Sequence, residues 1–221
     1  MVEISGTGWI GLLGIFVLVA VCGYLLGSIN SAIVICRLMF KKDIRKLGSG
    51  NAGMTNVMRC FGKKSAVLTL LGDVTKGILS VMIGRLVITL LAPGLPADYG
   101  AYIGAIFAVA GHMLPIYFGF KGGKGVAAAG GAIIALNPII AAVLLAVLLI
   151  VIAVGKMVSL GSIIGIAFYP ITTFLWYSRV TSDSSVFPTI CTAVIAVLII
   201  WMHRENIKRI AAGKENKIGS R

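Results

Sequence analysis

A short segment at positions 121–125, Lys-Gly-Gly-Lys-Gly, carries the strongest chemical signal in the sequence. Glycine allows backbone N–H groups to approach a ligand closely, and lysine adds a compact positive charge. A helix expected to start at the end of this segment adds further N–H groups and the positive end of its dipole. We therefore predict an anion site, most simply for phosphate, formed by Lys121, Gly122, Gly123 and Lys124. The alternative is that the lysines reach toward anionic lipid headgroups, but this does not explain the two glycines between them.

A second polar block covers residues 47–59 and has similar chemistry. Its glycines, hydroxyls and amides can surround an oxyanion with hydrogen-bond donors. Arg59 lies one helical turn after Thr55, so both side chains can face one ligand. The alternative is a solvated turn, which the same small polar residues favour, but a plain turn does not need the charge of Arg59. The predicted binding residues in this block are Ser49, Asn51, Thr55, Asn56 and Arg59.

Three further polar residues lie beside apolar segments. His112 comes shortly before the 121–125 segment and is predicted to shape the binding pocket or to act as a base, although a histidine at a helix end is often a structural hydrogen-bond donor. Ser159 and Ser162 begin a later apolar segment at a spacing of three residues. They either cap that helix or donate hydrogen bonds to a phosphate, and the sequence leaves both interpretations open.

Polar residues three positions apart also occur in the helical segments. His203 and Asn206 share one helix face at the end of the last apolar run, where they can bind a hydroxyl or a phosphate. Alternatively, His203 extends to the membrane edge and interacts with the helix dipole. Asp73 and Lys76 are predicted to form a structural ion pair, because a carboxylate within a membrane needs a partner. Arg85 needs a polar partner too, and the sequence does not identify it.

No pattern for a strong nucleophile or a metal site accompanies these residues. The fifth residue after His112 is Tyr117, and the fifth after His203 is Lys208, so the His-x-x-x-x-Asp acyltransferase pattern is absent. The sequence also lacks a Gly-x-Ser-x-Gly elbow, a Walker loop, and any His, Cys or carboxylate group with metal-ligand spacing. We expect no metal and no cofactor. Any reaction at these residues must therefore need no strong nucleophile from the protein.

The composition predicts an integral membrane protein that holds these residues on helices. The chain has 221 residues, of which 58% are hydrophobic and 12% are charged, and its mean hydropathy is +1.02. Such values exclude an ordinary soluble domain, so we expect one all-α, polytopic membrane domain over residues 1–221 with no separate soluble domain. The net charge of +13 is assigned to membrane topology and to contacts with anionic lipids, not to nucleic-acid binding.

Apolar runs predict seven transmembrane helices. A span needs about 20 residues, and the run at residues 126–154 contains Asn137-Pro138, which is typical of a helix break. Splitting this run puts nearly all loop lysines and arginines on one side and leaves only Arg179 on the other. The positive-inside rule therefore favours seven helices, some of them short, with the N-terminus outside and the C-terminus in the cytoplasm. The runs are residues 9–35, 66–91, 99–118, 126–154, 158–177 and 186–202.

Taken in order, these motifs resemble those of the bacterial acyl-phosphate:glycerol-3-phosphate acyltransferases over almost the whole chain. The chain departs from that family at Asn30, where proline is common, and at Gly161, where another small residue or serine is common. The matching motifs are Gly27-Ser28-Ile29, residues 47–59, Gly62-Lys63-Lys64, Asp73-x-x-Lys76-Gly77, Gly111-His112-x-x-Pro115, residues 120–126, residues 159–163 and Arg204-Glu205-Asn206-Ile207.

The resemblance implies an acyltransferase of the bacterial cytoplasmic (inner) membrane, with seven spans and an active site facing the cytosol. Such an enzyme moves a fatty acyl group from acyl phosphate to the sn-1 hydroxyl of glycerol 3-phosphate. The products are lysophosphatidic acid and phosphate, and this is the first step of phospholipid synthesis. The implied partners are these small molecules and membrane lipids, with no obligate protein partner and no nucleic acid.

Acyl phosphate is a mixed anhydride with a good leaving group, so positioning and charge stabilisation can supply the catalysis. The hydroxyl proton goes to a substrate phosphate oxygen, to His203 or to His112, and the sequence leaves this choice open. It also leaves open whether a thioester of acyl carrier protein or coenzyme A serves as donor. We expect Ser49, Asn51, Thr55, Arg59, His203 and Asn206 to bind glycerol phosphate. We expect Lys121, Gly122, Gly123, Lys124, Ser159 and Ser162 to bind acyl phosphate. The expected catalytic set is Ser49, Arg59, Lys121, Lys124, His203 and Asn206, with Asn56 and His112 as further binding residues.

Two other functions fit parts of the pattern. A transporter for a phosphorylated solute also uses broken helices and glycine-rich anion sites, but the 121–125 segment has no counterpart in the other half of the chain. A membrane scaffold without catalytic activity does not explain why glycine and lysine occur together. Release of phosphate with formation of lysophosphatidate would support the enzyme, and solute counterflow in liposomes would support the transporter.

Overall fold

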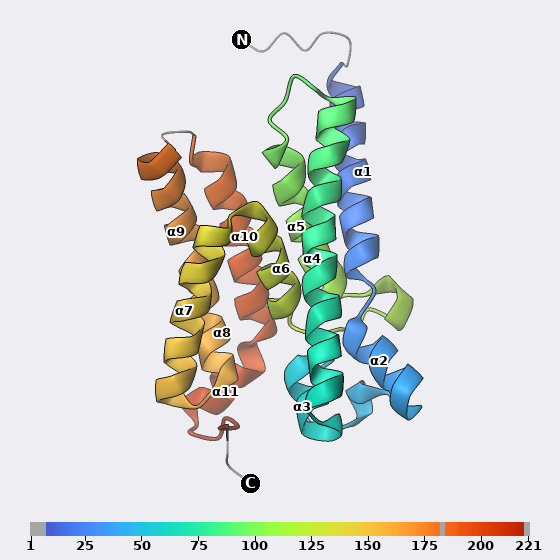
Figure 1. The fold of residues 1–221 in the computed structure, drawn as a ribbon, viewed down its shortest axis with the longest axis vertical. Helices are drawn as coiled ribbons and strands as arrows, with labels where there is room; N and C mark the ends of the chain where they lie inside the picture. Colours follow the sequence, from blue (N-terminus) through green and yellow to red (C-terminus); the bar gives the residue numbers. More distant parts are fainter. Residues whose placement is uncertain (1–7, 182–183, 219–221) are drawn as a thin grey trace. The chain divides into compact units, whose positions relative to one another are not determined.

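The computed structural model describes residues 8–181 and 184–218, and every regular element in these ranges is a helix. This agrees with the predicted all-α class. The chain divides into two compact units at the junction between Leu136 and Asn137. Each unit is described separately below, with the labels of Figure 1.

The first unit is built around one long helix, α4 (Figure 1), that contacts the five other α-helices of this unit. Its α-helices are α1 (Trp9–Gly27), α2 (Ser31–Phe40), α3 (Met54–Phe61), α4 (Lys63–Leu91), α5 (Asp98–Met113) and α6 (Val126–Leu136). Two short 3₁₀ turns, η1 (Ile44–Lys46) and η2 (Ile116–Phe118), lie in the connections. Helices α1, α5 and α6 pack against α4. The two polar loops of this unit are the connection from α2 to α3, which contains η1, and the connection from α5 to α6, which contains η2.

Glycines let these helices approach closely. A Cβ atom at Gly77 of α4 would collide with the carbonyl of Ala128 on α6. A Cβ atom at Gly84 or at Gly100 would collide with the backbone of the other residue, where α4 crosses α5. In a lipid environment, helices associate mainly through such close packing of small residues. The glycines of α4 therefore determine where α5 and α6 lie, and with them the loops that follow.

The first apolar run contains a break that differs from the prediction. We expected one helix over residues 9–35, but α1 ends at Gly27 and α2 begins at Ser31. Asn30 causes the break locally, because its Oδ1 accepts a hydrogen bond from Ile33 N at 3.1 Å and caps α2. Asparagine is a favoured N-cap residue because its oxygen satisfies a free N–H of the first turn.

The predicted break at Asn137-Pro138 is confirmed. Helix α6 ends at Leu136, and α7 begins at Pro138. Asn137 Oδ1 accepts hydrogen bonds from Ile139 N and Ile140 N, each at 3.0 Å, and Pro138 occupies the first turn, where a missing N–H has no cost. Helix α6 has 11 residues and rises roughly 16 Å, which is shorter than a hydrocarbon core of about 30 Å.

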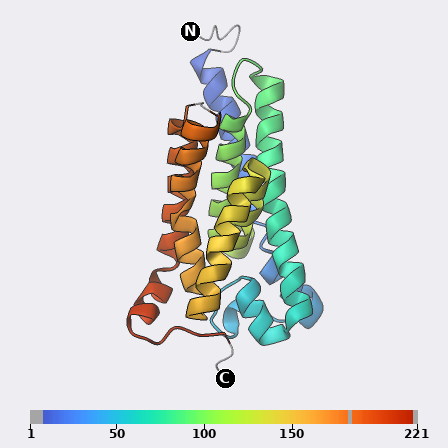
Figure 2. The same ribbon diagram turned by 60° about the vertical axis from the view of Figure 1, so that its left-hand side comes forward.

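The second unit consists of α7 and the helices that follow it. They are α7 (Pro138–Gly155), α8 (Val158–Ala167), α9 (Tyr169–Leu175), the π-helical turn η3 (Trp176–Thr181), α10 (Val186–Met202) and α11 (Arg204–Ala211). Gly161 brings α8 against α7, since a Cβ atom there would lie 2.8 Å from the carbonyl of Leu148. After α11 the chain turns back along its own unit (Figure 2), and Ile218 N donates to Lys156 O at 2.7 Å.

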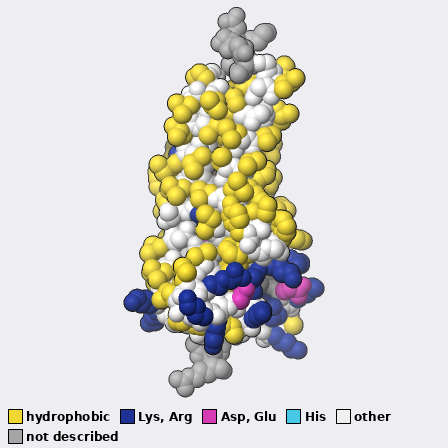
Figure 3. Space-filling view, turned by 90° about the vertical axis from the view of Figure 1, so that its right-hand side faces the viewer, with side chains coloured by type: hydrophobic (Ala, Val, Ile, Leu, Met, Phe, Trp, Pro, Cys, Tyr) yellow, Lys and Arg dark blue, Asp and Glu magenta, His cyan; other side chains and the backbone are white. Residues whose placement is uncertain are grey.

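Long apolar helices with exposed side chains are typical of a membrane protein. Among the described residues, five helices are long and apolar enough to cross a membrane, or six if α10 and α11, which are bent by 59°, form one span. The face of the first unit in Figure 3 is apolar over its long helices and gathers lysines and arginines at one end. The count of seven spans and the orientation of the termini remain predictions.

Candidate active site

Asn56 organises the first polar loop from its centre. Its buried side chain donates from Nδ2 to Leu47 O at 3.0 Å and to Asn51 O at 3.1 Å, and its Oδ1 accepts from Ser49 N at 2.9 Å. The hydrogen-bonding capacity of this amide is therefore used within the loop. We predicted Asn56 as a substrate-binding residue, but these contacts assign it to holding Ser49 and Asn51 in place.

The same loop leads into α3, which carries two predicted binding residues. Thr55 lies half-buried in the first turn, where backbone N–H groups lack acceptors within the helix. Arg59 lies one turn later and is exposed. The expected pairing of Thr55 and Arg59 on one helix face is therefore present.

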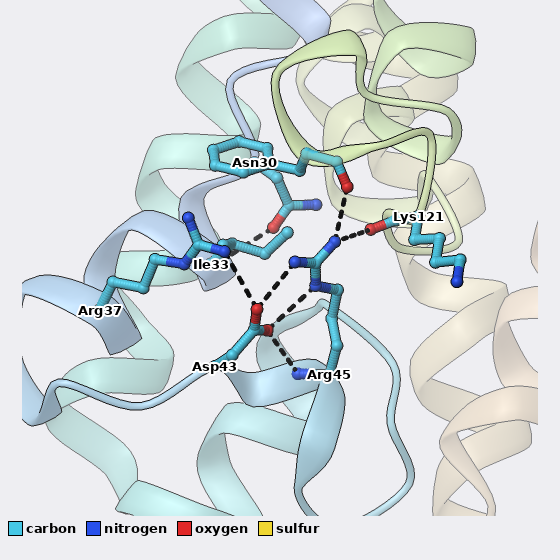
Figure 4. A network of polar contacts seen from close by, with 7 residues as sticks. Asn30, Ile33, Arg37, Asp43, Arg45 and Lys121 are labelled. Carbon is cyan, nitrogen blue, oxygen red and sulfur yellow. Dashed lines mark hydrogen bonds and ion pairs between the residues drawn. The ribbon is translucent and has the colours of Figure 1, made fainter.

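Arg45 joins the first loop to the 121–125 segment (Figure 4). Its Nη1 donates to Phe118 O at 2.6 Å and to Lys121 O at 3.2 Å, while its Nη2 lies 2.7 Å from Asp43 Oδ2. The Lys121 side chain points away from this network and is exposed. The sequence offered no special reason to select Arg45, since one arginine in a basic loop resembles a topology determinant.

Asp43 is the anion that holds Arg45. Hydrogen bonds from the Arg45 side chain keep the pKa of Asp43 well below its usual range. Partial burial opposes this shift, and hydrogen bonds from the Arg45 backbone N–H and from Arg37 add to it. The same ion pair raises the pKa of Arg45. Both groups are therefore charged at neutral pH, and the loop junction keeps its link.

The 121–125 segment uses its two central amides internally, which corrects part of the prediction. Gly122 N donates to Met113 O and Gly123 N donates to His112 O, each at 3.1 Å. These N–H groups are not available to an anion. The N–H groups of the first turn of α6, directly after this segment, lack acceptors within the helix and are the better candidates.

Gly123 marks the place where the two loops meet. A Cβ atom at Gly123 would collide with His112 Nε2 and with the carbonyl of Ala52 in the first loop. The segments that lead into α3 and α6 are thus adjacent at Ala52 and Gly123. Lys124 follows, half-buried, so the first unit brings a lysine, a histidine and two helix N-termini close together.

His112 lies beside the predicted ion pair of α4. Lys76 Nζ is 2.8 Å from Asp73 Oδ1 and 2.9 Å from His112 Nδ1, and all three side chains are at most 4% exposed. The ion pair between Asp73 and Lys76 is therefore confirmed. The unidentified partner of Arg85 is Asp98 on α5, at 3.1 Å.

In the second unit, His203 lies at the bend between α10 and α11. It is buried, and its Nδ1 is 2.8 Å from the carbonyl oxygen of Ile199. Because a carbonyl only accepts hydrogen bonds, Nδ1 carries a proton. Asn206 lies one turn later on α11 and is also buried.

Glu215 connects the predicted polar residues of the second unit. Its Oε1 accepts from Ser159 Oγ and from Asn206 Nδ2, and its Oε2 accepts from Arg209 Nε, each at 2.8 Å. Burial opposes its ionisation, but the hydrogen bonds from Asn206, Arg209 and Ser159 outweigh burial and lower the pKa of Glu215. The structure therefore unites Ser159 and Asn206 through a third residue.

Sequence reasoning missed Glu215. Its only signal is that it is an acid in a basic tail, between Lys214 and Lys217, which also describes a solvated charge. Gly213 has a φ of +66° and allows the turn that returns the tail to α8. Ser162 lies in the same helix and donates to Val158 O at 2.9 Å. The alternative that Ser159 or Ser162 caps α8 is wrong, because the N-cap position is Met157 and has no side-chain cap.

Comparisons with known proteins agree with the sequence motifs. A family model described as glycerol-3-phosphate acyltransferase matches residues 17–213. Proteins named glycerol-3-phosphate acyltransferase from Clostridioides difficile and Halorhodospira halophila are similar to this chain. The first is 40% identical over 206 residues and covers 93% of this chain and 97% of the relative. The second is 42% identical over 208 residues, and the match covers 92% of this chain and 97% of that relative.

Solved structures are similar over the same length. The crystal structure of PlsY (YgiH), an integral membrane glycerol 3-phosphate acyltransferase, in its glycerol 3-phosphate form has a TM-score of 0.76 and 36% identity, and covers 92% of this chain and 96% of PlsY. The lysophosphatidic acid form of PlsY has a TM-score of 0.74 and 35% identity, and the match covers 92% of this chain and 95% of PlsY. The resemblance inferred from the motifs is confirmed, and the chain belongs to the glycerol-3-phosphate acyltransferase family of membrane enzymes.

Proposed function

We propose that this enzyme uses acyl phosphate as donor and acylates the sn-1 hydroxyl of glycerol 3-phosphate, giving lysophosphatidic acid and inorganic phosphate. Glycerol 3-phosphate as acceptor and lysophosphatidic acid as product are supported by the two forms in which PlsY was crystallised. Acyl phosphate as donor is supported by the chemistry of the polar residues, which offer cations and hydrogen-bond donors but no activated nucleophile.

The observation that carries this proposal is the meeting of two helix N-termini at Ala52 and Gly123. The segments that lead into α3 and α6 lie next to each other there, and each helix N-terminus that follows offers N–H groups and a partial positive charge. Lys124 and Arg59 add full charges at the same two helices. We assign this junction to phosphoryl binding, with Ser49, Asn51 and Thr55 as further donors and Lys121 as an exposed cation.

The chemistry is a direct transfer. The glycerol hydroxyl oxygen forms a bond to the acyl carbon, the bond between that carbon and the phosphate oxygen breaks, and phosphate leaves with the electron pair. Cations and N–H donors stabilise the oxyanion and the departing phosphate without an acyl-enzyme intermediate.

The second unit carries a polar group of its own. The ring of His203 is oriented by the hydrogen bond from Nδ1 to Ile199 O, and histidine is a common acceptor for a hydroxyl proton. Ser159, Ser162 and Asn206 lie on α8 and α11 of this unit, and Glu215 orients Ser159 and Asn206. We assign these residues to substrate binding and His203 to proton transfer.

We further propose that the enzyme spans the cytoplasmic (inner) membrane seven times. The spans would be α1, α4, α5, the short α6, α7, the segment α8–η3 and α10, with the N-terminus outside and the polar loops facing the cytosol. The distribution of lysine and arginine supports this orientation. Fusion of green fluorescent protein or alkaline phosphatase to each terminus tests it, since the first is fluorescent only in the cytosol and the second is active only outside.

The donor is tested with purified protein in detergent. Glycerol 3-phosphate is supplied with acyl phosphate, acyl-coenzyme A or acyl carrier protein thioester of one chain length. We expect lysophosphatidate and an equal amount of phosphate only with acyl phosphate. Equal or faster product formation from a thioester would contradict the proposal for the donor. Acylation at the sn-2 position, seen by NMR of the product, would contradict the proposed site of transfer.

A further inference from the structure

We propose that Lys76, paired with Asp73, is a positioning residue that fixes the neutral ring of His112 in the tautomer with its proton on Nε2, so that this N–H points at the junction of the two loops. Assigning a phosphoryl oxygen as the acceptor of this N–H rests on the proposed function. The tautomer itself rests only on geometry within the first unit.

Three acceptors surround the Lys76 ammonium group. Nζ donates to Ile29 O at 2.9 Å, contacts His112 Nδ1 at 2.9 Å and forms an ion pair with Asp73 Oδ1 at 2.8 Å. A lysine ammonium has three N–H donors and no acceptor. The environment therefore matches a protonated amine that donates to His112 Nδ1, which leaves the ring proton on Nε2.

The carboxylate of Asp73 requires this assignment of charge. Its side chain is 1% exposed, and its oxygens form no hydrogen bond of good geometry within the described part of the chain. A buried carboxylate needs a nearby cation. Lys76 Nζ is the closer candidate at 2.8 Å, whereas His112 Nδ1 is 3.4 Å away. The charge therefore belongs to Lys76, and His112 is neutral.

The opposite side of the ring faces Gly123. A Cβ atom at Gly123 would collide with His112 Nε2 and with Ala52 O, so Nε2 lies at the meeting point of the loops. The His112 carbonyl also receives the Gly123 N–H at 3.1 Å. The His112 backbone thus holds the 121–125 segment, and the Nε2 proton of its ring is offered at the proposed phosphoryl site.

The two histidines of the chain carry their ring protons on different nitrogen atoms. His203 donates from Nδ1 to a carbonyl, whereas His112 has its proton on Nε2. A ring with a proton on the substrate side donates a hydrogen bond and cannot accept a proton there. Of the three proton acceptors left open by the sequence, this tautomer removes His112 and leaves a substrate phosphate oxygen and His203.

Ring ¹⁵N NMR tests this directly because the chain has only two histidines. Protein labelled at the imidazole nitrogens is measured in detergent near neutral pH, and the signals are assigned with His203→Gln. We expect His112 as a neutral ring with its proton on Nε2 and His203 with its proton on Nδ1. A proton on Nδ1 of His112, or a doubly protonated ring, would overturn the proposal.

The double substitution Asp73→Asn with Lys76→Met removes the ion pair that is proposed to position the His112 ring. It removes both charges, so no buried carboxylate is left without a cation. We expect the single His112 tautomer to become a mixture and kcat to fall at least about tenfold, with little change in KM, because one oriented donor is lost. Lys76→Met alone is made in parallel.

The matched control is Arg85→Met with Asp98→Asn, which removes a different ion pair of α4, the one with α5. It should leave both the His112 tautomer and kcat unchanged. Loss of kcat in the Asp73 and Lys76 double variant with an unchanged tautomer would contradict the positioning role. If the wild-type enzyme shows the Nε2–H tautomer but no acyl transfer from acyl phosphate, the proposed donor fails while the tautomer assignment stands.

Discussion

Glu215 Oε1 accepts a hydrogen bond from Asn206 Nδ2 at 2.8 Å and thereby ties the tail of the chain to α11. The same oxygen accepts from Ser159 Oγ at 2.8 Å, so a residue of α8 is held at the same point. Since the Glu215 side chain is 5% exposed, these contacts are shielded from water. The carboxylate orients two residues that we assign to substrate binding.

Glu215→Ala should lower both stability and activity. Loss of its charge-assisted hydrogen bonds should cost roughly 2 kcal/mol of unfolding free energy, mostly through Ser159 and Asn206, because Arg209 is 41% exposed and its pair is screened. Thermal unfolding in detergent and kcat/KM measure the two effects. Glu205→Ala is the control, since its pair with Lys208 is exposed, and it should change stability by less than about 0.5 kcal/mol.

Stability should fall at acidic pH through Asp43 and Glu215. The pKa of each carboxyl is lower in the folded protein than its ordinary value. Each therefore stabilises the fold above its unfolded pKa of about 4, and this contribution is lost as pH falls toward the folded pKa. Unfolding midpoints between pH 6 and pH 3 should drop less steeply in Asp43→Asn combined with Glu215→Gln. An equally steep drop in that variant would contradict this origin.

Gly123→Ala should abolish most activity. The added methyl group would collide with His112 Nε2 and Ala52 O and push the loops apart, and such a displacement disturbs substrate positioning. Gly130→Ala is a matched control on α6, because nothing lies within 4 Å of its Cβ position. This control should keep its activity and gain up to about 1 kcal/mol of helix stability. Assays of both purified variants decide the matter.

Asn56→Leu should destabilise the first loop while leaving α3 intact. The substitution keeps similar size but leaves Leu47 O and Asn51 O without their donor, at a cost of about 1–3 kcal/mol for each buried group. Asn56→Asp keeps the acceptor for Ser49 N, so the stability of its loop should lie between that of the wild type and that of Asn56→Leu. Limited proteolysis of the loop measures the effect. Resistance of Asn56→Leu equal to that of the wild type would argue against the bracing role.

Lys124→Ala and Arg59→Ala should each reduce kcat/KM by at least about 100-fold, because each removes a charge assigned to a phosphoryl group. Both proteins should still insert into membranes, as shown by their yield and elution profile. Lys42→Ala removes an exposed cation of the α2–η1 connection and should leave activity unchanged. Near-normal turnover in both Lys124→Ala and Arg59→Ala would refute the assignment.

Local features of the sequence predicted local structure well. Asn137-Pro138 indicated the break between α6 and α7, because a proline and a capping asparagine act on their own neighbours. The three-residue spacing of Asp73 and Lys76 indicated their ion pair, since helix geometry alone brings such residues together. The break at Asn30 was missed, because the small polar residues around it, Ser28 and Ser31, carry no charge and leave the apolar run without a charged residue.

The sequence by itself determined the helical membrane class, the family and the polar motifs, because these depend on composition and on residue order. Only the tertiary structure decided which groups those motifs contact. It showed that the amides of Gly122 and Gly123 are used by α5, that Asn56 braces its own loop, and that Glu215 and Arg45 hold residues far away in the chain. Hydrogen bonds between distant segments depend on how helices pack, and packing is set by close contacts that residue types and spacing do not specify.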